Sequence, residues 1–210
     1  MAFTVLIPAM SSLRGERFKH IKPLHAARRG IGRTFQHNAL FKGLSVIDNV
    51  LAGLTRHRQA SLFENAFGIG REPAERRDFN RRADRMIEFL GLTPHRDAIV
   101  SKLPYGVQKR VDIARALVAD PTLLLLDEPM AGMNADEKGD LADLLLAANR
   151  DLGITVVLIE HDIGVVMELS HHVVVLDYGR KAGDGTPDQV RNDPAVIAAY
   201  LGKPHREMAA

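Results

Sequence analysis

Apolar and polar positions recur along this chain with two different spacings, and these spacings predict strands that alternate with helices. Three short apolar runs predict strands: Leu123–Leu126, Thr155–Ile159 and Val173–Leu176. Three further stretches carry apolar residues at helical spacing: 107–119, 138–151 and 164–169. A last helix is predicted from about Pro194. Strands that alternate with helices are typical of an open α/β sheet with helices on its faces.

The first hundred residues predict a different organisation. Residues 1–14 contain a short apolar strand followed by polar residues. Residues 15–36 indicate a strand, a turn at Lys22-Pro23, a short helix and a second extended stretch that ends at Gln36. Residues 45–100 indicate helices only, one beginning near Ser45 and another from Arg81 to Leu90 that is ended by Gly91. We therefore expect an α/β core formed by 1–44 and 101–210, with 45–100 as a helical subdomain.

Two adjacent carboxylates, Asp127 and Glu128, follow the Leu123 run. Such an apolar run, bounded by charge and Pro129, predicts a strand that is buried on both faces in a parallel sheet. Ligands of these sheets lie at the carboxyl ends of the strands, where both acids would emerge. A magnesium ion with a nucleotide triphosphate suits the pair, one carboxylate binding the metal and the other a water. The alternative is an exposed turn with two solvated acids.

Three other positions are candidates for phosphate chemistry. His161 follows the Thr155 strand and has a side chain that could donate to a phosphate oxygen. Gln36 follows a Gly-rich turn and could reach a metal or a water through its amide. The sequence from Leu103 to Gln108 begins a helix, whose free amides favour phosphate, and Gly106 allows close approach of the backbone. Taken singly, each has an ordinary explanation: His161 as a surface histidine, Gln36 as an unremarkable glutamine, and Leu103 to Gln108 as the start of a helix.

Composition narrows the class of protein. The 210 residues are 46% apolar and 26% charged, enough for one domain with a sizeable core and a small appended subdomain. No cysteine is present, which excludes disulfides and thiolate metal sites and suits a reducing compartment. No apolar run approaches the length of a membrane span. Basic residues crowd the first 33 positions, but no nucleic-acid-binding module accompanies them, so we expect no nucleic-acid partner.

The order of these segments resembles the ATP-binding subunit of ABC transporters. Gln36 is similar to the Q-loop of that family, and the signature motif is matched by six consecutive residues: Leu103, Pro104, Tyr105, Gly106, Val107 and Gln108. Leu123 to Glu128 resemble Walker B, Ala131 to Asn134 the D-loop, and His161 the switch histidine. The resemblance implies a P-loop NTPase-like core, a mostly parallel sheet flanked by helices, with a small helical subdomain.

The same resemblance implies a role for each residue. Asp127 would hold Mg²⁺ and Glu128 would be the general base for ATP hydrolysis. Gln36 would contact metal and attacking water, and His161 would stabilise the γ-phosphate. The signature residues and Asn134 would face the ATP of a second subunit, in a homodimer or a heterodimer. The partners implied are transmembrane permease subunits, docked near His37 to Asn49, with the chain cytoplasmic and peripheral on the inner face of the plasma membrane.

Four stretches resemble one branch of the family, the ATPases of branched-chain amino-acid importers. They are Gly30 to Gln36, Leu103 to Gly106, Ile159 to Asp162, and Tyr200 to Gly202. ATPases for urea or short-amide import and for lipopolysaccharide export are the alternatives. No residue here would touch a transported solute, so the branch rests on likeness alone.

The 210 residues contain no Walker A loop, the Gly-x4-Gly-Lys-Ser/Thr sequence whose amides and lysine cradle phosphates. In the family this loop lies upstream of the part that resembles Gly15 to Gln36. Three hypotheses follow: a working ATPase in N-terminally shortened form, a degraded remnant, or a non-hydrolysing partner subunit. We also expect the missing Walker A strand to leave an open sheet edge that residues 1–14 do not fill.

Overall fold

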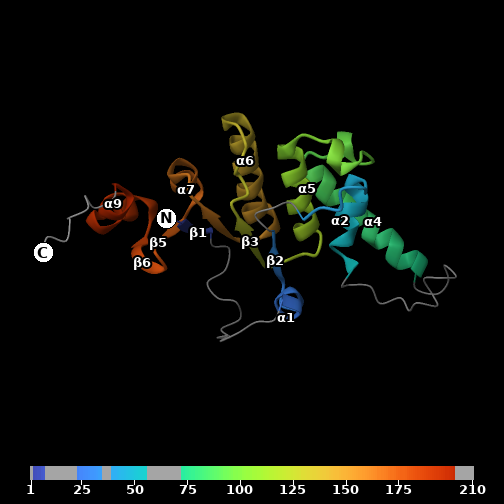
Figure 1. The fold of residues 1–210 in the computed structure, drawn as a ribbon. Helices are drawn as coiled ribbons and strands as arrows, with labels where there is room; N and C mark the ends of the chain where they lie inside the picture. Colours follow the sequence, from blue (N-terminus) through green and yellow to red (C-terminus); the bar gives the residue numbers. More distant parts are fainter. Residues whose placement is uncertain (1, 8–22, 35–38, 56–71, 202–210) are drawn as a thin grey trace, which may run out of the picture. The chain divides into compact units, whose positions relative to one another are not determined.

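The computed structural model describes residues 2–7, 23–34, 39–55 and 72–201 (Figure 1). The chain divides into two compact units, which are described in turn. One unit comprises 1–17, 125–131 and 138–210, and the other comprises 18–124 and 132–137. We call them the strand unit and the helical unit.

The strand unit is built on a mixed sheet. Its strands lie in the order β3 (Leu123–Asp127, from Leu125 onward), β4 (Thr155–Glu160), β1 (Ala2–Ile7), β5 (His172–Asp177) and β6 (Arg180–Gly185). Its helices are α6 (Ala135–Leu152, from Lys138 onward), α7 (Ile163–Leu169), α8 (Pro187–Arg191) and α9 (Pro194–Leu201). Helix α7 contacts β1 and β4, whereas α8 and α9 contact the β5–β6 hairpin (Figure 1).

Strand β1 lies between β4 and β5 and is antiparallel to both. Phe3 is opposite Glu160 on one side, and Val5 is opposite Val173 on the other. Strands β4 and β5 therefore run in the same direction, with the N-terminal segment inserted between them. Our expectation of an unfilled edge was wrong at this position. The six residues of β1 pair with the backbone N–H and C=O groups of both neighbouring strands. This backbone pairing does not require that β1 resemble any family motif.

Strand β6 and helix α8 were not predicted from the sequence, whereas β5 was predicted as the Val173–Leu176 run. Tyr178 and Gly179 have φ values of 44° and 76°, as two-residue hairpin turns require. The residues of β6, Arg-Lys-Ala-Gly-Asp-Gly, give almost no apolar alternation, so periodicity could not find the strand. Helix α8 did carry a sequence signal, because Thr186 and Gln189 have the spacing of a capping box and Pro187 is the first residue of the helix.

The Leu123 run forms β3, as predicted, but it is not buried on both faces. Leu124 and Leu126 are buried, whereas Leu123 and Leu125 are partly exposed. One face of the strand is therefore covered more completely than the other. Alternate residues of β4 and β5, including Val156, Leu158, Val173 and Val175, are also buried and form the centre of the strand unit.

Among the described residues, the helical unit combines one short strand with four α-helices and two 3₁₀ turns. Its elements are α1 (Pro23–Arg28), β2 (Ile31–Arg33), α2 (Val46–Ala52), α4 (Glu72–Phe89), α5 (Tyr105–Leu117) and two 3₁₀ turns, η2 (Thr93–His95) and η3 (Val100–Lys102). Gly30 O accepts hydrogen bonds from Thr122 N at 2.7 Å and Leu123 N at 3.1 Å, so β2 begins beside the start of β3.

Helices α2, α4 and α5 pack together around a buried apolar core. The core residues come from all three helices and the turns that follow: Val46, Val50, Leu54, Ile87, Leu90, Leu92, Val111 and Leu117. Helix α2 begins where expected, because the Ser45 side chain accepts from Asp48 N. Helix α4 begins earlier than its predicted start at Arg81, since its charged first half carries little apolar periodicity.

Close packing of α2 against α5 makes Gly53 a site of large expected destabilisation. A Cβ atom at this position would lie 2.1 Å from the carbonyl oxygen of Arg115 and 2.7 Å from Val118 Cγ1. Because backbone must move to relieve this overlap, we expect Gly53→Ala to lower the free energy of unfolding by about 1–3 kcal/mol. Urea unfolding followed by circular dichroism measures it. Gly43→Ala is the control, since nothing lies within 4 Å of its Cβ position, and equal midpoints for both variants would contradict the prediction.

Candidate functional site

The acidic pair at the end of β3 lies in a tight, strained turn. Asp127 is the last residue of β3, and Glu128 has a φ of 45°, a left-handed conformation that residues with a Cβ adopt only rarely. Glu128 N donates to Ile159 O at 2.9 Å, and Ala131 N donates to Glu128 O at 3.3 Å. Both carboxylates are partly exposed, so the turn presents two acids at the end of a largely buried strand.

His161 lies beside this turn, as the order of the motifs predicted. Its Nδ1 is 3.7 Å from Glu128 Oε1, and its side chain is 61% exposed. The distance is longer than a direct hydrogen bond, but a small movement or one bridging water would join the two groups. The strand unit thus brings together a carboxylate that could accept a proton and an imidazole that could donate one.

Glu160 is a site residue that the sequence analysis missed. Its side chain is 2% exposed; Oε1 accepts from Met130 N at 3.0 Å and Oε2 from His161 N at 3.3 Å. Burial raises the pKa of the Glu160 carboxyl, and the two backbone N–H groups oppose that rise. A signal was present, because Val156, Leu158 and Glu160 share one side of a strand with a period of two, and the two apolar members are buried.

Asp162 has a structural role in this part of the molecule. It is the N-cap of α7, and its Oδ2 accepts from Lys138 Nζ at 2.6 Å. The hydrogen bond from Lys138 lowers the pKa of the Asp162 carboxyl, since it favours the charged form. Asp162, the acid next to His161, therefore caps helix α7 and forms an ion pair with Lys138.

The signature residues begin helix α5 in the helical unit. Pro104 is the N-cap and supplies no side-chain hydrogen bond, while Gln108 Nε2 donates to Leu103 O at 2.8 Å. Tyr105 is exposed, and Lys109 Nζ lies 5.6 Å from the centre of its ring, within range of a cation–π contact. The first amides of α5 are thus left without a side-chain cap at Pro104.

Gly106 and Asn134 lie in one packed arrangement. A Cβ at Gly106 would lie 2.8 Å from Glu137 Oε1, and the other carboxylate oxygen of Glu137 accepts from Asn134 N at 3.0 Å. Glu137 N in turn donates to Asn134 Oδ1 at 2.9 Å, which caps the start of α6. The absence of a side chain at Gly106 leaves room for that capping carboxylate, so the signature and D-loop segments are neighbours here.

The donor chemistry at Asp127 and Glu128 fits magnesium, a hard cation that binds carboxylate oxygens together with waters and phosphates. Within the described residues, no cluster of three or more His, Cys, Asp or Glu side chains could hold a metal by itself. Gln36, the other predicted metal contact, lies outside the described residues.

Comparison with known proteins decides the family. The family described as "ABC transporter" matches residues 6–131, and the chain is 38% identical over 194 residues to the high-affinity branched-chain amino acid transport ATP-binding protein LivG of Escherichia coli K12. The chain belongs to the ABC transporter family. A second family, described as "Branched-chain amino acid ATP-binding cassette transporter", matches residues 180–206 of this ABC transporter protein.

Further relatives agree with this assignment. The ABC transporter protein BraF of Pseudomonas aeruginosa, also named a high-affinity branched-chain amino acid transport ATP-binding protein, is 37% identical over 191 residues. That match, like the LivG match, covers 91% of this chain and 75% of the relative. The crystal structure of the ADP conformation of MJ1267, an ATP-binding cassette of an ABC transporter, superposes with a TM-score of 0.71 at 28% identity, covering 87% of this chain and 72% of that one. The predicted fold class is confirmed.

No helix among the described residues has both the length and the apolar character needed to cross a membrane.

Proposed function

We propose that this protein is the ATP-hydrolysing subunit of an importer for branched-chain amino acids. The observation that carries the proposal is the carboxyl edge of the strand unit, where Asp127, Glu128 and His161 lie together in a chain whose relatives are named branched-chain amino acid transport ATP-binding proteins. The protein would act from the cytoplasmic side of the membrane, bound peripherally to permease subunits.

In the proposed mechanism each group has a separate task. Asp127 would hold Mg²⁺, which when bound supplies charge neutralisation for the phosphates. Glu128, whose side chain is 30% exposed, would accept the proton of the attacking water. His161, 3.7 Å from Glu128, would donate a hydrogen bond to the γ-phosphate as negative charge shifts during transfer. Gln36 would contact the metal and the water.

The signature would serve a second subunit. The uncapped amides at the start of α5, with Gly106 among them, would face the nucleotide of a partner chain, and Asn134 would lie beside them. A dimer of two ATP-binding subunits follows from this proposal. Residues 45–100 would form the helical subdomain, since every element described between Val46 and Lys102 is an α-helix or a 3₁₀ turn.

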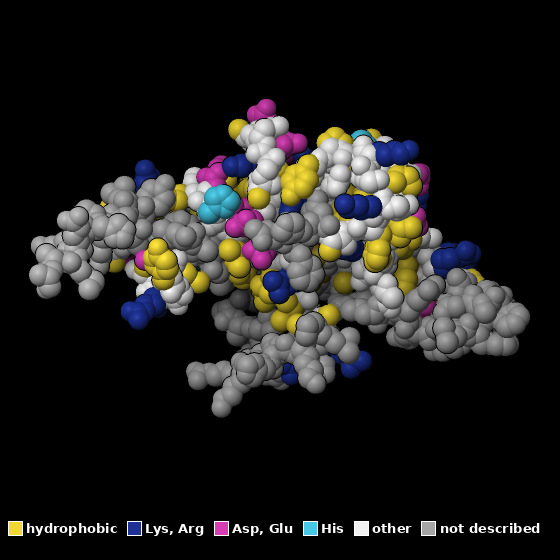
Figure 2. All heavy atoms as spheres, viewed as in Figure 1, with side chains coloured by type: hydrophobic (Ala, Val, Ile, Leu, Met, Phe, Trp, Pro, Cys, Tyr) yellow, Lys and Arg dark blue, Asp and Glu magenta, His cyan; other side chains and the backbone are white. Residues whose placement is uncertain are grey.

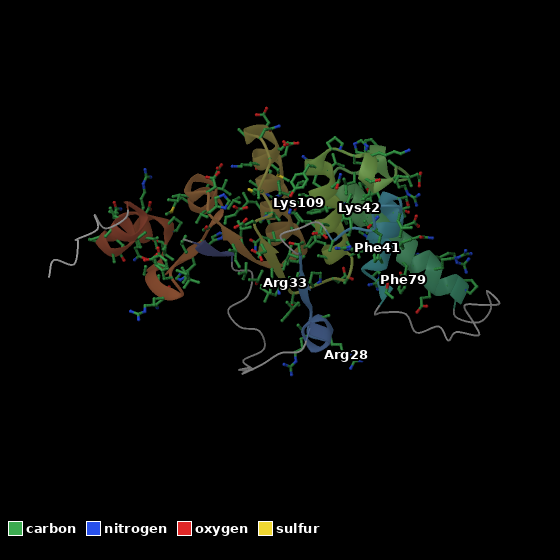
Figure 3. The ribbon with its side chains drawn as sticks, in the orientation of Figure 1. Arg28, Arg33, Phe41, Lys42, Phe79 and Lys109 are labelled. Carbon is green, nitrogen blue, oxygen red and sulfur yellow. The ribbon has the colours of Figure 1, made fainter. Side chains whose placement is uncertain are left out.

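The segment 39–45 is proposed to contact the permease. Phe41 and Lys42, labelled in Figure 3, and Leu44 are exposed in this segment. The visible face of the unit mixes basic and apolar side chains (Figure 2). Two anchors hold the segment. Asn49, fully buried, accepts from Phe41 N at 2.8 Å, and Arg115 Nη1 donates to Ala39 O at 2.7 Å. A loop that is held by two hydrogen bonds and carries an exposed aromatic side chain suits a protein contact.

Phe41→Ala should weaken this contact. Phe41 is 54% exposed, and loss of an aromatic side chain that becomes buried at an interface costs on the order of 2 kcal/mol, or about 30-fold in affinity. Co-purification with permease subunits of the same organism from detergent-solubilised membranes measures the effect. Tyr178→Ala, which removes a 99% exposed aromatic from the β5–β6 turn, is the matched control. Equal recovery of permease by the Phe41 and Tyr178 variants would contradict the assignment.

Uptake experiments test the proposed solute. In a strain of the source organism that lacks this gene, uptake of radiolabelled leucine should fall while uptake of urea is unchanged, and a plasmid copy should restore it. Loss of urea uptake in place of leucine uptake would refute the proposal. So would unchanged uptake of both solutes.

A further inference from the structure

The carboxylate of Glu160 joins the two segments that carry the candidate chemistry of the strand unit. One oxygen binds the backbone N–H of Met130, two residues after Glu128, and the other binds the backbone N–H of His161. The contact with Met130 is buried, since Glu160 is 2% and Met130 1% exposed, whereas the contact with His161 is partly buried. A single side chain therefore touches the turn after β3 and the residue after β4 at once.

The turn that Glu160 holds is one that would not persist unaided. Glu128 has a φ of 45°, which places its Cβ close to its own backbone and is unfavourable for any residue except glycine. Such conformations survive only where surrounding contacts fix them. Three hydrogen bonds contribute to fixing this turn: Glu128 N donates to Ile159 O at 2.9 Å, Ala131 N to Glu128 O at 3.3 Å, and Met130 N to Glu160 Oε1 at 3.0 Å.

The chemistry of the site requires a carboxylate at this position. Both partners, Met130 N and His161 N, are donors, so both oxygens of the side chain must accept. A glutamine of nearly the same volume could satisfy one donor and would turn its own NH₂ group towards the other. A buried N–H group without an acceptor is costly in free energy. Replacement of one carboxylate oxygen by an NH₂ group should therefore weaken the contact with Met130 N or with His161 N.

We propose that Glu160 is a positioning residue that fixes the Glu128 carboxylate relative to the His161 imidazole. The proposal rests on the proposed function for its catalytic meaning, since Glu128 and His161 are the base and the phosphate donor there. Glu160 touches neither nucleotide nor water in this role. It acts by holding the two backbones from which those side chains extend, with Glu128 Oε1 3.7 Å from His161 Nδ1. The Glu160 carboxylate also faces the imidazole directly, since its Oε2 lies 3.9 Å from the same nitrogen.

Nuclear magnetic resonance of the 210-residue chain tests this role without nucleotide. Two signals are followed in wild type and Glu160→Gln: hydrogen exchange of the Met130 amide, and the imidazole resonances of His161. We expect exchange at Met130 to be at least ~10-fold faster in Glu160→Gln, as loss of a buried hydrogen bond implies, and the His161 imidazole signals to shift. Amides in the β5–β6 hairpin should exchange as in wild type.

The control is Glu168→Gln on α7, where the same substitution is made at an exposed glutamate of the same unit. It should leave both signals unchanged. If Glu160→Gln fails to fold, Glu160→Asp is measured by the same criteria, because its shorter side chain cannot span both donors. Unchanged Met130 exchange and unchanged His161 signals in the folded variant would overturn the proposal. So would a uniform acceleration of exchange throughout the unit, which indicates a general packing role. Because no readout involves ATP, a failure of the proposed ATPase function is detected separately.

Discussion

The 210-residue chain is expected to bind Mg-ATP with a Kd of about 1 mM or weaker. The sequence contains no Gly-x4-Gly-Lys-Ser/Thr loop, so the backbone amides and lysine that would cradle the phosphates are missing from these residues. The remaining groups at the edge of β3, Asp127 and Glu128, are anionic and would repel a triphosphate in the absence of metal. Isothermal titration calorimetry with and without Mg²⁺ measures the affinity.

The affinity of the 210-residue chain is compared with that of a version to which a strand and a Gly-x4-Gly-Lys-Ser/Thr loop have been added at the N-terminus. We expect its affinity for Mg-ATP to be at least ~100-fold higher, equivalent to about 2.7 kcal/mol. Replacement of the loop lysine by alanine is the control and should return the affinity towards that of the 210-residue chain. Micromolar, magnesium-dependent binding by the 210-residue chain itself would show that its phosphate contacts come from elsewhere and would contradict the prediction.

Glu128→Gln should abolish most hydrolysis in the extended version and change nothing measurable in the 210-residue chain. Removal of a general base that deprotonates the attacking water lowers kcat by roughly 10²–10⁴-fold. The amide keeps the volume of Glu128, and the left-handed turn at φ 45° is held by backbone bonds that the substitution leaves in place. Nucleotide affinity should therefore stay within about threefold of the unsubstituted extended version. Steady-state phosphate release gives kcat and KM, and calorimetry gives the affinity.

Two controls sharpen this result. Glu168→Gln changes an exposed glutamate of α7 in the same unit and should leave kcat unaltered. Asp127→Asn should instead weaken the dependence on Mg²⁺, since this carboxylate is the proposed metal ligand. A fall in phosphate release by the Glu128→Gln variant of the 210-residue chain, relative to that chain, would mean that hydrolysis proceeds there without the loop. An unchanged kcat in the extended version would remove Glu128 from the role of base.

A non-hydrolysing partner subunit is the second candidate function. The observation that favours it is a segment similar to the signature motif, Leu103 to Gln108, in a sequence of 210 residues without a phosphate loop. Such a chain would complete the nucleotide site of another subunit while leaving its own without a cradle. Addition of the 210-residue chain to an intact ATP-binding subunit should then raise the ATPase rate per intact subunit, and Gly106→Asp should abolish that stimulation.

The sequence by itself determined the family, the helices and strands with strong periodicity, and the candidate chemistry at Asp127, Glu128 and His161. These features depend on local spacing: β3, β4 and β5 appeared as apolar runs, and α2 was marked by the capping residue Ser45. The motif order that indicated the family is likewise a property of the linear chain. Such signals need no knowledge of which segment lies beside which.

Only the tertiary structure decided which groups meet. Strand β1 lies between β4 and β5 because their backbone groups need partners there, and β6 forms by pairing with β5 although its own residues are a poor strand pattern. Gly53 is required by the carbonyl of Arg115, 62 residues away along the chain, and Glu160 is buried because two backbone donors converge on it. A hydrogen bond or a close contact between distant residues leaves no period in the sequence. Local pattern therefore predicted most of the strands and helices and the candidate residues Asp127, Glu128 and His161, whereas long-range packing placed the buried Glu160 carboxylate beside them.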